Sequence, residues 1–280
     1  SMELIEEFAS LKSWLNGNEI INLILCGMGG SSLAPEVISK TYQKKITILD
    51  STDPEHIRSV LPATLRNTLI IIGSKSGSTV ETSSHKAFFE DLLTREGLDI
   101  KNHLLIVTDP GSPLDLIARS AGLKVCNADP FVGGRFSALS SFGLIPALLM
   151  GVDVEEILKA ATNAAKTFTE VNSVPVKVAT LLVENSSQAI FFSDEGSSVP
   201  GLSDWIEQLI AESTGKDRRG RIPIVLESVR GESFGYGPLV SFIKGEGALS
   251  VVGSLGEQFI FWEWVTVLIG RALGVDPFNQ

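Results

Sequence analysis

Short apolar runs alternate with segments of helical length along the first half of the chain. The runs are rich in branched side chains and end in glycine or polar residues; they cover residues 19–27, 44–50, 67–74, 103–109 and 123–128. Helical patterns lie between them, at residues 32–42, 53–61, 79–97 and 112–122. Continuous apolar strands that alternate with helices are typical of a parallel sheet covered on both faces, so the predicted fold class is α/β.

The pattern changes after about residue 137. Consecutive helices are predicted at residues 137–152, 154–171 and 176–185. Apolar runs then return at residues 188–193, 222–228 and 248–254, and a last helix is predicted at 257–273. A chain of 280 residues is longer than one typical domain. We therefore place a boundary near residue 150, between two α/β units.

Composition and charge narrow the classes of partner. The chain is 44% hydrophobic, and its net charge of −10 disfavours nucleic acid, although one local pocket can still be electropositive and take a phosphorylated small molecule. Cys26 and Cys126 each end an apolar run, which predicts reduced, buried thiols rather than a disulfide or metal pair. The longest apolar segment, residues 259–269, is interrupted by Glu263 and is shorter than the roughly 18 residues that span a bilayer. It predicts a buried helix, and no membrane partner is expected.

The first glycine-rich loop, "CGMGGSSLAPE" at residues 26–36, follows a strand and opens a helix. Glycines let backbone N–H groups approach an anion, and the helix N-terminus adds its positive dipole end. The alternative is a dinucleotide fingerprint, which Gly27, Gly29 and Asp50 fit. Ser32 stands where that fingerprint has its third glycine. The loop alone leaves both interpretations open.

A second loop, "SKSGST" at residues 74–79, also follows a strand and opens a helix. It combines four hydroxyl groups with one lysine and one glycine. A phosphate needs several donors that converge on one point, and charge-assisted donors are the strong ones. The alternative is an ordinary helix cap by Ser78 or Thr79, but a cap needs one hydroxyl. Two such loops at neighbouring strand ends favour one sugar phosphate over a dinucleotide.

These loops resemble those of a known family. "GMGGSSLAPE" at residues 27–36 is similar to the glycine loop of phosphoglucose isomerases, and "SKSGSTVET" at residues 74–82 to their serine/threonine phosphate loop. Both belong to domains of the sugar isomerase (SIS) type. Three later stretches are also similar to the family, at residues 132–146, 204–216 and 273–280.

The resemblance implies an isomerase that interconverts glucose 6-phosphate and fructose 6-phosphate through a cis-enediol, with no metal or organic cofactor. It implies two SIS-type subdomains, at residues 1–150 and 151–280. The implied phosphate ligands are Ser74, Lys75, Ser76, Ser78 and Thr79. The other implied substrate-binding residues are Gly30 and Ser31, at the sugar end, and Gln280. Arg135 matches the arginine that stabilises the enediolate, and Glu212 the base that moves a proton between carbons 1 and 2.

The sequence itself makes Glu212 a credible base. Leu202, Trp205, Ile206, Leu209 and Ile210 form a helical apolar stripe. Glu212 lies seven residues after Trp205, at the edge of that stripe, in the last turn before Gly215. Burial and the helix dipole would both disfavour its ionised form and make it a stronger base. The alternative is a partly exposed glutamate without a role, and Arg135 could equally be a surface arginine.

The chain departs from the family in the residues that open the sugar ring, which are a histidine and a lysine. The family's histidine follows the catalytic glutamate, whereas this chain has no histidine after His103. The lysine lies several residues beyond "DPFNQ", and this chain ends at Gln280. We therefore expect a truncated second subdomain and a chain that binds sugar phosphates but isomerises poorly. The missing residues also suggest that the chain is an excised part of a fusion such as the bifunctional transaldolase/phosphoglucose isomerases.

Two other function classes stay open. A non-catalytic SIS module would keep the serine loop but has no need of Arg135 or Glu212. A dinucleotide-binding oxidoreductase would use the glycine loop and not the serine loop. The resemblance further implies a cytoplasmic enzyme of glycolysis and gluconeogenesis, from a family that often builds its site across a homodimer.

Overall fold

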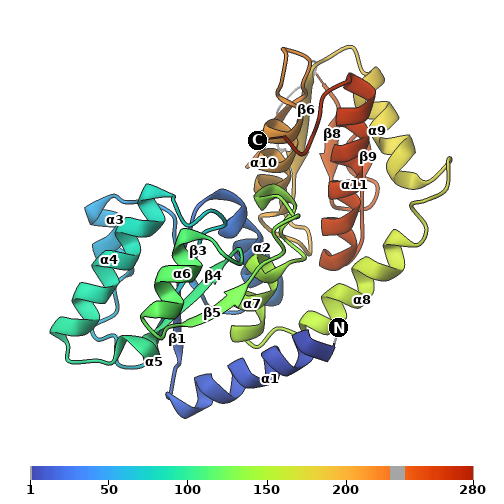
Figure 1. The fold of residues 1–280 in the computed structure, drawn as a ribbon. Coiled ribbons are helices and arrows are strands. Elements are labelled where there is room, and N and C mark those ends of the chain that lie inside the picture. Colours follow the sequence, from blue (N-terminus) through green and yellow to red (C-terminus); the bar gives the residue numbers. More distant parts are fainter. Residues whose placement is uncertain (1, 228–236, 280) are drawn as a thin grey trace. The chain divides into compact units, whose positions relative to one another are not determined.

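The computed structural model describes residues 2–227 and 237–279. The chain divides into two compact units, Ser1–Asp153 and Val154–Gln280. Each unit has its own parallel sheet with helices packed against it (Figure 1). The predicted α/β class is therefore confirmed.

Five parallel strands form the sheet of the first unit, in the order β2-β1-β3-β4-β5. They are β1 (Asn22–Gly27), β2 (Thr47–Leu49), β3 (Thr68–Gly73), β4 (Leu104–Thr108) and β5 (Lys124–Asn127). From β1 the chain moves outward to β2 and then returns to β3 on the other side of β1. In open α/β sheets, the crevice at the carboxyl end of such a switch point is where ligands bind.

Helices cover both faces of this sheet. They are α1 (Met2–Gly17), α2 (Leu33–Tyr42), α3 (Pro54–Val60), α4 (Val80–Arg95), α5 (Ile100–His103), α6 (Pro113–Ser120) and α7 (Ser141–Leu149). The predicted helices are all present, whereas α1 and α5 were not predicted. Two short 3₁₀ segments, η1 (Gly29–Ser31) and η2 (Gly134–Phe136), lie beside the sheet's carboxyl edge.

The core of the first unit is a layer of aliphatic side chains from the strands, closed by α4 and α6. Its buried members are Ile24, Cys26, Leu49, Leu65, Ile70, Ile72, Phe89, Leu93, Leu104, Ile106, Leu114, Ala118 and Leu123. Alternate residues such as Leu25, Ile71 and Leu105 are buried too, which is why the strands read as continuous apolar runs. Burying one such side chain contributes about 1.5–3 kcal/mol. Both cysteines are buried, and neither forms a disulfide within the described residues, as predicted.

The second unit has a four-stranded parallel sheet in the order β7-β6-β8-β9. The strands are β6 (Ala189–Ser193), β7 (Ile222–Val225), β8 (Leu239–Ser241) and β9 (Leu249–Ser250). β8 was not predicted, because three residues carry no readable alternation. The run predicted at 248–254 forms a strand of only two residues, and the run at 222–228 ends at Val225, with Ser228 outside the described residues.

Four helices pack around this second sheet: α8 (Val154–Ala165), α9 (Val174–Glu184), α10 (Leu202–Thr214) and α11 (Leu255–Leu273). α11 is the predicted buried helix. Its Phe259 ring meets Trp205 of α10 at a centroid distance of 4.8 Å, and Trp262 meets Phe192 of β6 at 5.4 Å. The Trp262 indole N–H donates to Gln258 at 3.1 Å, so its polar atom is satisfied inside the core. Among the described helices, none combines the length and apolar character needed to cross a membrane.

One carboxyl group of α11 predicts a pH-dependent stability. Oε1 of Glu263 is buried without a hydrogen-bond partner among the described residues, and burial raises the pKa of Glu263 to about 8. The unfolded chain releases this proton near pH 4.5, whereas the folded chain keeps it until about pH 8. Stability therefore falls across that window, by at most about 1.4 kcal/mol per pH unit, and levels off above it.

Glu263→Gln removes this titration, so the variant should gain stability over the wild type as the pH rises from 5 to 8. Urea unfolding of both proteins at several pH values measures the difference. Glu246→Gln, at an exposed position of the same unit, is the control and should show no such trend. A Glu263→Gln difference that is the same at every pH would contradict this account of Glu263.

Candidate functional site

The two predicted loops start side by side at the carboxyl edge of the first sheet. β1 and β3 are in register, and Gly27 and Gly73 are Cα partners at their ends. Oγ of Ser31 lies 3.2 Å from the carbonyl oxygen of Gly73 and 2.9 Å from that of Met28. The glycine loop is therefore held directly against the end of β3, at the switch point.

The serine loop is a tight turn organised by its own hydroxyls. Oγ of Ser74 accepts the N–H of Gly77 at 3.1 Å, and Oγ of Ser76 accepts the N–H of Ser78 at 3.2 Å. Gly77 has a φ of +69°, and a Cβ there would lie 2.5 Å from Cβ of Leu114 on α6. Only glycine fits this position. The turn leaves the side chains of Ser76 and Ser78 exposed.

The loop does not behave as an ordinary helix cap. Thr79 occupies the N-cap position of α4, but no side chain caps the helix there. Oγ1 of Thr79 lies instead 3.4 Å from Oγ of Ser74. The backbone N–H groups in the first turn of α4 therefore have no side-chain acceptor. Helices bind phosphate and other anions through such N–H groups at their positive ends.

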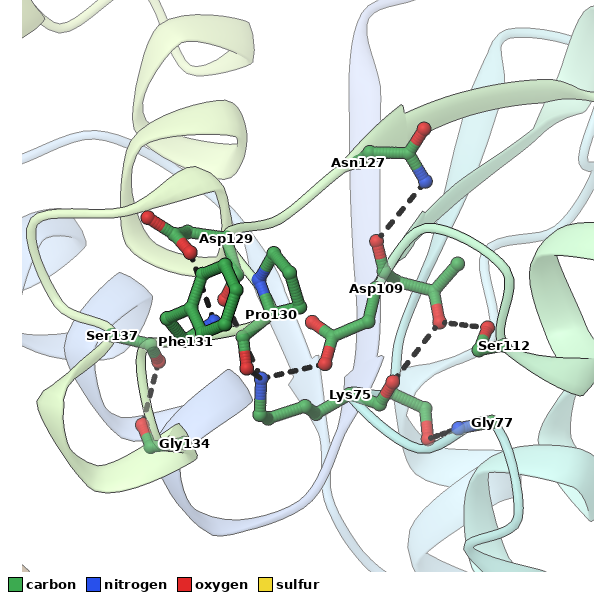
Figure 2. Close-up of polar contacts among 12 residues, drawn as sticks. Lys75, Gly77, Asp109, Ser112, Asn127, Asp129, Pro130, Phe131, Gly134 and Ser137 are labelled. Carbon is green, nitrogen blue, oxygen red and sulfur yellow. Dashed lines mark hydrogen bonds and ion pairs between the residues drawn. The ribbon is translucent and has the colours of Figure 1, made fainter. Parts of the chain in front are cut away.

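Lys75 lies in this loop, and its side chain reaches the neighbouring strand ends (Figure 2). Nζ forms an ion pair with Oδ2 of Asp109 at 2.6 Å, and lies 3.4 Å and 3.3 Å from the carbonyl oxygens of Asp129 and Pro130. The sequence predicts Lys75 as a source of charge for a ligand, but this ammonium already has an anionic partner. The N–H of Lys75 donates no hydrogen bond within the described part of the chain.

Arg135 lies in η2, which packs against the glycine loop. Oγ of Ser137 donates to the carbonyl oxygen of Gly134 at 2.6 Å and lies 3.4 Å from that of Gly30. The two segments touch so closely that a Cβ on Gly30 would lie 2.2 Å from the carbonyl oxygen of Gly134. Arg135 is 9% exposed, so it is not a surface arginine. The first unit thus gathers both loops and Arg135 at one edge.

Glu212 lies in the last turn of α10, in the second unit. The predicted apolar stripe of this helix is buried, but the expectation that Glu212 is itself buried is wrong, because its side chain is exposed. The buried face of α10 includes Ile206, Ile210 and Thr214, which places Trp205 at one edge and the residue seven positions later in solvent. Oε1 of Glu212 accepts a hydrogen bond from the amide of Gln208 at 2.9 Å.

Lys216 joins the last two sequence motifs within the second unit. Its Nζ donates to the carbonyl oxygen of Asp276 at 2.6 Å and to that of Asn279. The "DPFN" segment therefore lies at the end of α10 that carries Glu212. Gln280, the other predicted residue of this motif, lies outside the described residues.

Two residues of this arrangement were missed by the sequence predictions, Asp109 and Lys216. A signal for Asp109 was present, because it ends an apolar run at the carboxyl edge of the sheet. Lys216 stands in a motif that resembles the family, yet nothing in its spacing predicts a contact sixty residues later along the chain.

Comparisons with known proteins agree with the sequence motifs. The family described as phosphoglucose isomerase matches residues 2–220. The chain is 35% identical over 235 residues to glucose-6-phosphate isomerase of Thermus thermophilus, covering 79% of this chain and 56% of that protein. The chain spans about half the length of the curated relatives it matches.

Two solved structures are similar over nearly the whole chain. A hypothetical protein of Thermus thermophilus superposes with a TM-score of 0.85 at 26% identity, over 99% of this chain and 85% of that one. A glucose-6-phosphate isomerase of Chlamydia trachomatis superposes with a TM-score of 0.82 at 21% identity, over 98% and 70%. The second likeness concerns the fold alone.

The close contact between the glycine loop and η2 predicts that Gly30→Ala damages the site. The new Cβ would overlap the backbone of Gly134, so the two segments must move apart and take Arg135 away from the glycine loop. Overpacking of this kind costs roughly 1–3 kcal/mol. Thermal unfolding should show a lower midpoint, and titration should show weaker binding of fructose 6-phosphate, the ligand that the sequence motifs imply.

Gly17→Ala is the matched control, since a Cβ on Gly17 meets nothing within 4 Å. It should leave both measurements unchanged. A Gly30→Ala protein with wild-type stability and affinity would show that the two segments are not in this contact.

Proposed function

Because the chain belongs to the phosphoglucose isomerase family, we propose that the protein interconverts glucose 6-phosphate and fructose 6-phosphate through a cis-enediol intermediate. The observation that carries the proposal is the serine loop at an uncapped helix N-terminus, beside a buried arginine and at the switch point of a parallel sheet. These groups supply donors for a phosphate and a cation for an oxyanion at the same edge of one sheet.

The phosphate is held by the serine loop. The proposed donors are the hydroxyls of Ser74, Ser76, Ser78 and Thr79 and the backbone N–H of Lys75. Exposure of Ser76 and Ser78 supports this assignment, as does the open first turn of α4. Several donors fixed before the ligand arrives need no reorganisation on binding.

The sugar end of the substrate lies toward Gly30, Ser31 and Arg135. In the reaction, a base removes the proton from carbon 2 of the open-chain aldose and returns it to carbon 1, while the hydroxyl proton of carbon 2 passes to the oxygen of carbon 1 to leave the ketose carbonyl. The oxygen at carbon 1 carries the negative charge of the intermediate, and the guanidinium of Arg135 stabilises it. Glu212 is the proposed base, and Gln280 the proposed further contact with substrate.

The family likeness alone supports three further parts of the proposal: a cytoplasmic location, a place in glycolysis and gluconeogenesis, and assembly as a homodimer or fusion to a transaldolase domain. Light scattering of the purified chain measures its assembly.

Glu212→Gln should slow proton transfer sharply. In deuterated water, the wild-type protein should place deuterium on carbon 1 of fructose 6-phosphate or carbon 2 of glucose 6-phosphate, which proton NMR detects. Removing a general base costs roughly 10²–10⁴-fold. Glu207→Gln, on the same helix, is the control and should exchange at the wild-type rate. A Glu212→Gln protein that exchanges as fast as wild type contradicts the role of Glu212. Wild-type binding of fructose 6-phosphate without any exchange would favour a non-catalytic sugar-phosphate module.

Ser78→Ala should weaken phosphate binding without loss of the fold, since the Ser78 hydroxyl contacts only Ser76 among the described residues. A hydrogen bond to a charged group contributes about 1.5–3 kcal/mol, so the dissociation constant for inorganic phosphate should rise roughly 10-fold or more. Calorimetric titration measures it. Ser84→Ala is the control, because that hydroxyl donates to Val80 within α4. Equal phosphate affinities for Ser78→Ala and wild type would rule out Ser78 as a ligand.

A further inference from the structure

We propose that Asp109 is a positioning residue of this site, which acts by holding the ammonium of Lys75 where it fixes the segment leading to Arg135. The inference rests on the proposed function, because it concerns the sugar end of the same substrate. Neither Asp109 nor this role of Lys75 follows from the phosphate-binding assignment of the serine loop.

The ammonium of Lys75 is a junction of three strand ends (Figure 2). Lys75 follows β3, Asp109 follows β4, and Asp129 and Pro130 follow β5. Nζ meets one oxygen of each of these three residues, with Asp109 at 2.6 Å as the nearest. Three acceptors match the three protons of an ammonium group, so this geometry fills its donor capacity.

Charge balance makes the pair interdependent. Oδ1 of Asp109 is buried and has no hydrogen-bond partner among the described residues. The side chains of Lys75 and Asp109 are 26% and 17% exposed. In such a partly buried pair, loss of one partner leaves the other charge uncompensated. The ammonium of Lys75 therefore stabilises the ionised carboxylate of Asp109, and that carboxylate in turn fixes the direction of the Lys75 side chain.

The backbone of the Asp109 loop is fixed independently of Lys75's charge. The N–H of Ser112 donates to the carbonyl oxygen of Asp109 at 3.2 Å, and the Ser112 hydroxyl pairs with Thr108 at 2.8 Å. Asp115 accepts the N–H of Gly111 at 2.8 Å, and this bond lowers the pKa of Asp115. A rigid loop makes Asp109 a fixed anchor.

The anchored segment continues to Arg135 through short-range contacts. The Asp129 carboxylate accepts the N–H of Phe131 at 2.9 Å, and the Asp129 carbonyl accepts the N–H of Val132 at 3.2 Å. In the next turn, the N–H of Phe136 donates to the carbonyl oxygen of Gly133 at 3.0 Å. A shift of the Asp129–Pro130 carbonyls therefore moves η2. The serine loop keeps its own hydroxyl contacts, none of which uses the Lys75 side chain.

The direction in which Asp109→Asn changes ligand affinity distinguishes a positioning role from a purely electrostatic one. Asp109→Asn removes a negative charge close to an anion site. The loss of this Coulomb repulsion would by itself strengthen the binding of every anion. Positioning predicts the opposite for the sugar phosphate. Affinity for fructose 6-phosphate should fall about 10-fold, while affinity for inorganic phosphate should stay equal or rise.

The experiment is calorimetric titration of the wild type, Asp109→Asn, Lys75→Met and the double variant with fructose 6-phosphate and with inorganic phosphate. Because both single changes break the same junction, the double variant should lose no more fructose 6-phosphate affinity than the weaker-binding single variant. Thermal unfolding of each variant, measured separately from ligand binding, shows that it is folded. Asp91→Asn, which breaks an exposed ion pair with Arg95 on α4, is the control and should match wild type with both ligands.

Three results would overturn the positioning role. The first is an Asp109→Asn protein that binds both ligands at least as tightly as wild type. The second is additive losses in the double variant. The third is a Lys75→Met protein that loses phosphate and fructose 6-phosphate affinity equally while Asp109→Asn loses neither, which would make Lys75 a direct ligand. A wild-type chain that binds neither ligand would instead overturn the proposed function, and this inference with it.

Discussion

The arrangement of the first unit depends on the parallel register of β1 and β3. Because Gly27 and Gly73 are partners, both strands stop at the same level and both connecting loops leave the sheet together. The Ser31 hydroxyl then joins one loop to the end of the other strand. A register shift of one residue would turn the apolar side chains of β3 to the wrong faces and separate the loops. The same hydrophobic packing therefore sets both the core and the spacing of the site.

The proposed phosphate site would rely on backbone polarity more than on side-chain charge. The cation of the serine loop, Lys75, is paired with Asp109, and a protein with a net charge of −10 offers little general attraction for an anion. What stays available is the open end of α4 and the hydroxyls in front of it. Partial charges of this kind act at short range, so they select a ligand that fits and not any anion nearby.

The sequence predicted the α/β class, the strands of the first unit and the residues at their carboxyl edge, because buried parallel strands and glycine-rich loops leave strong local signals. It did not predict β8, whose three residues show no period. It also predicted that burial acts on Glu212 at the edge of the apolar stripe, whereas the side chain just beyond Trp205 on that edge is exposed. The Lys75–Asp109 pair joins residues 34 positions apart, and no local pattern reports such a contact.

The turn at Gly77 restricts which substitutions the serine loop can accept during evolution. Its missing side chain leaves the space that Cβ and the backbone of Leu114 occupy, and its φ of +69° excludes most other residues. Position 77 is therefore held to glycine by the backbone and Cβ of position 114, whichever larger side chain that position carries. An altered ligand preference at the serine loop is more accessible by exchanging its outward hydroxyls than by reshaping the turn, because reshaping would require α6 to move as well.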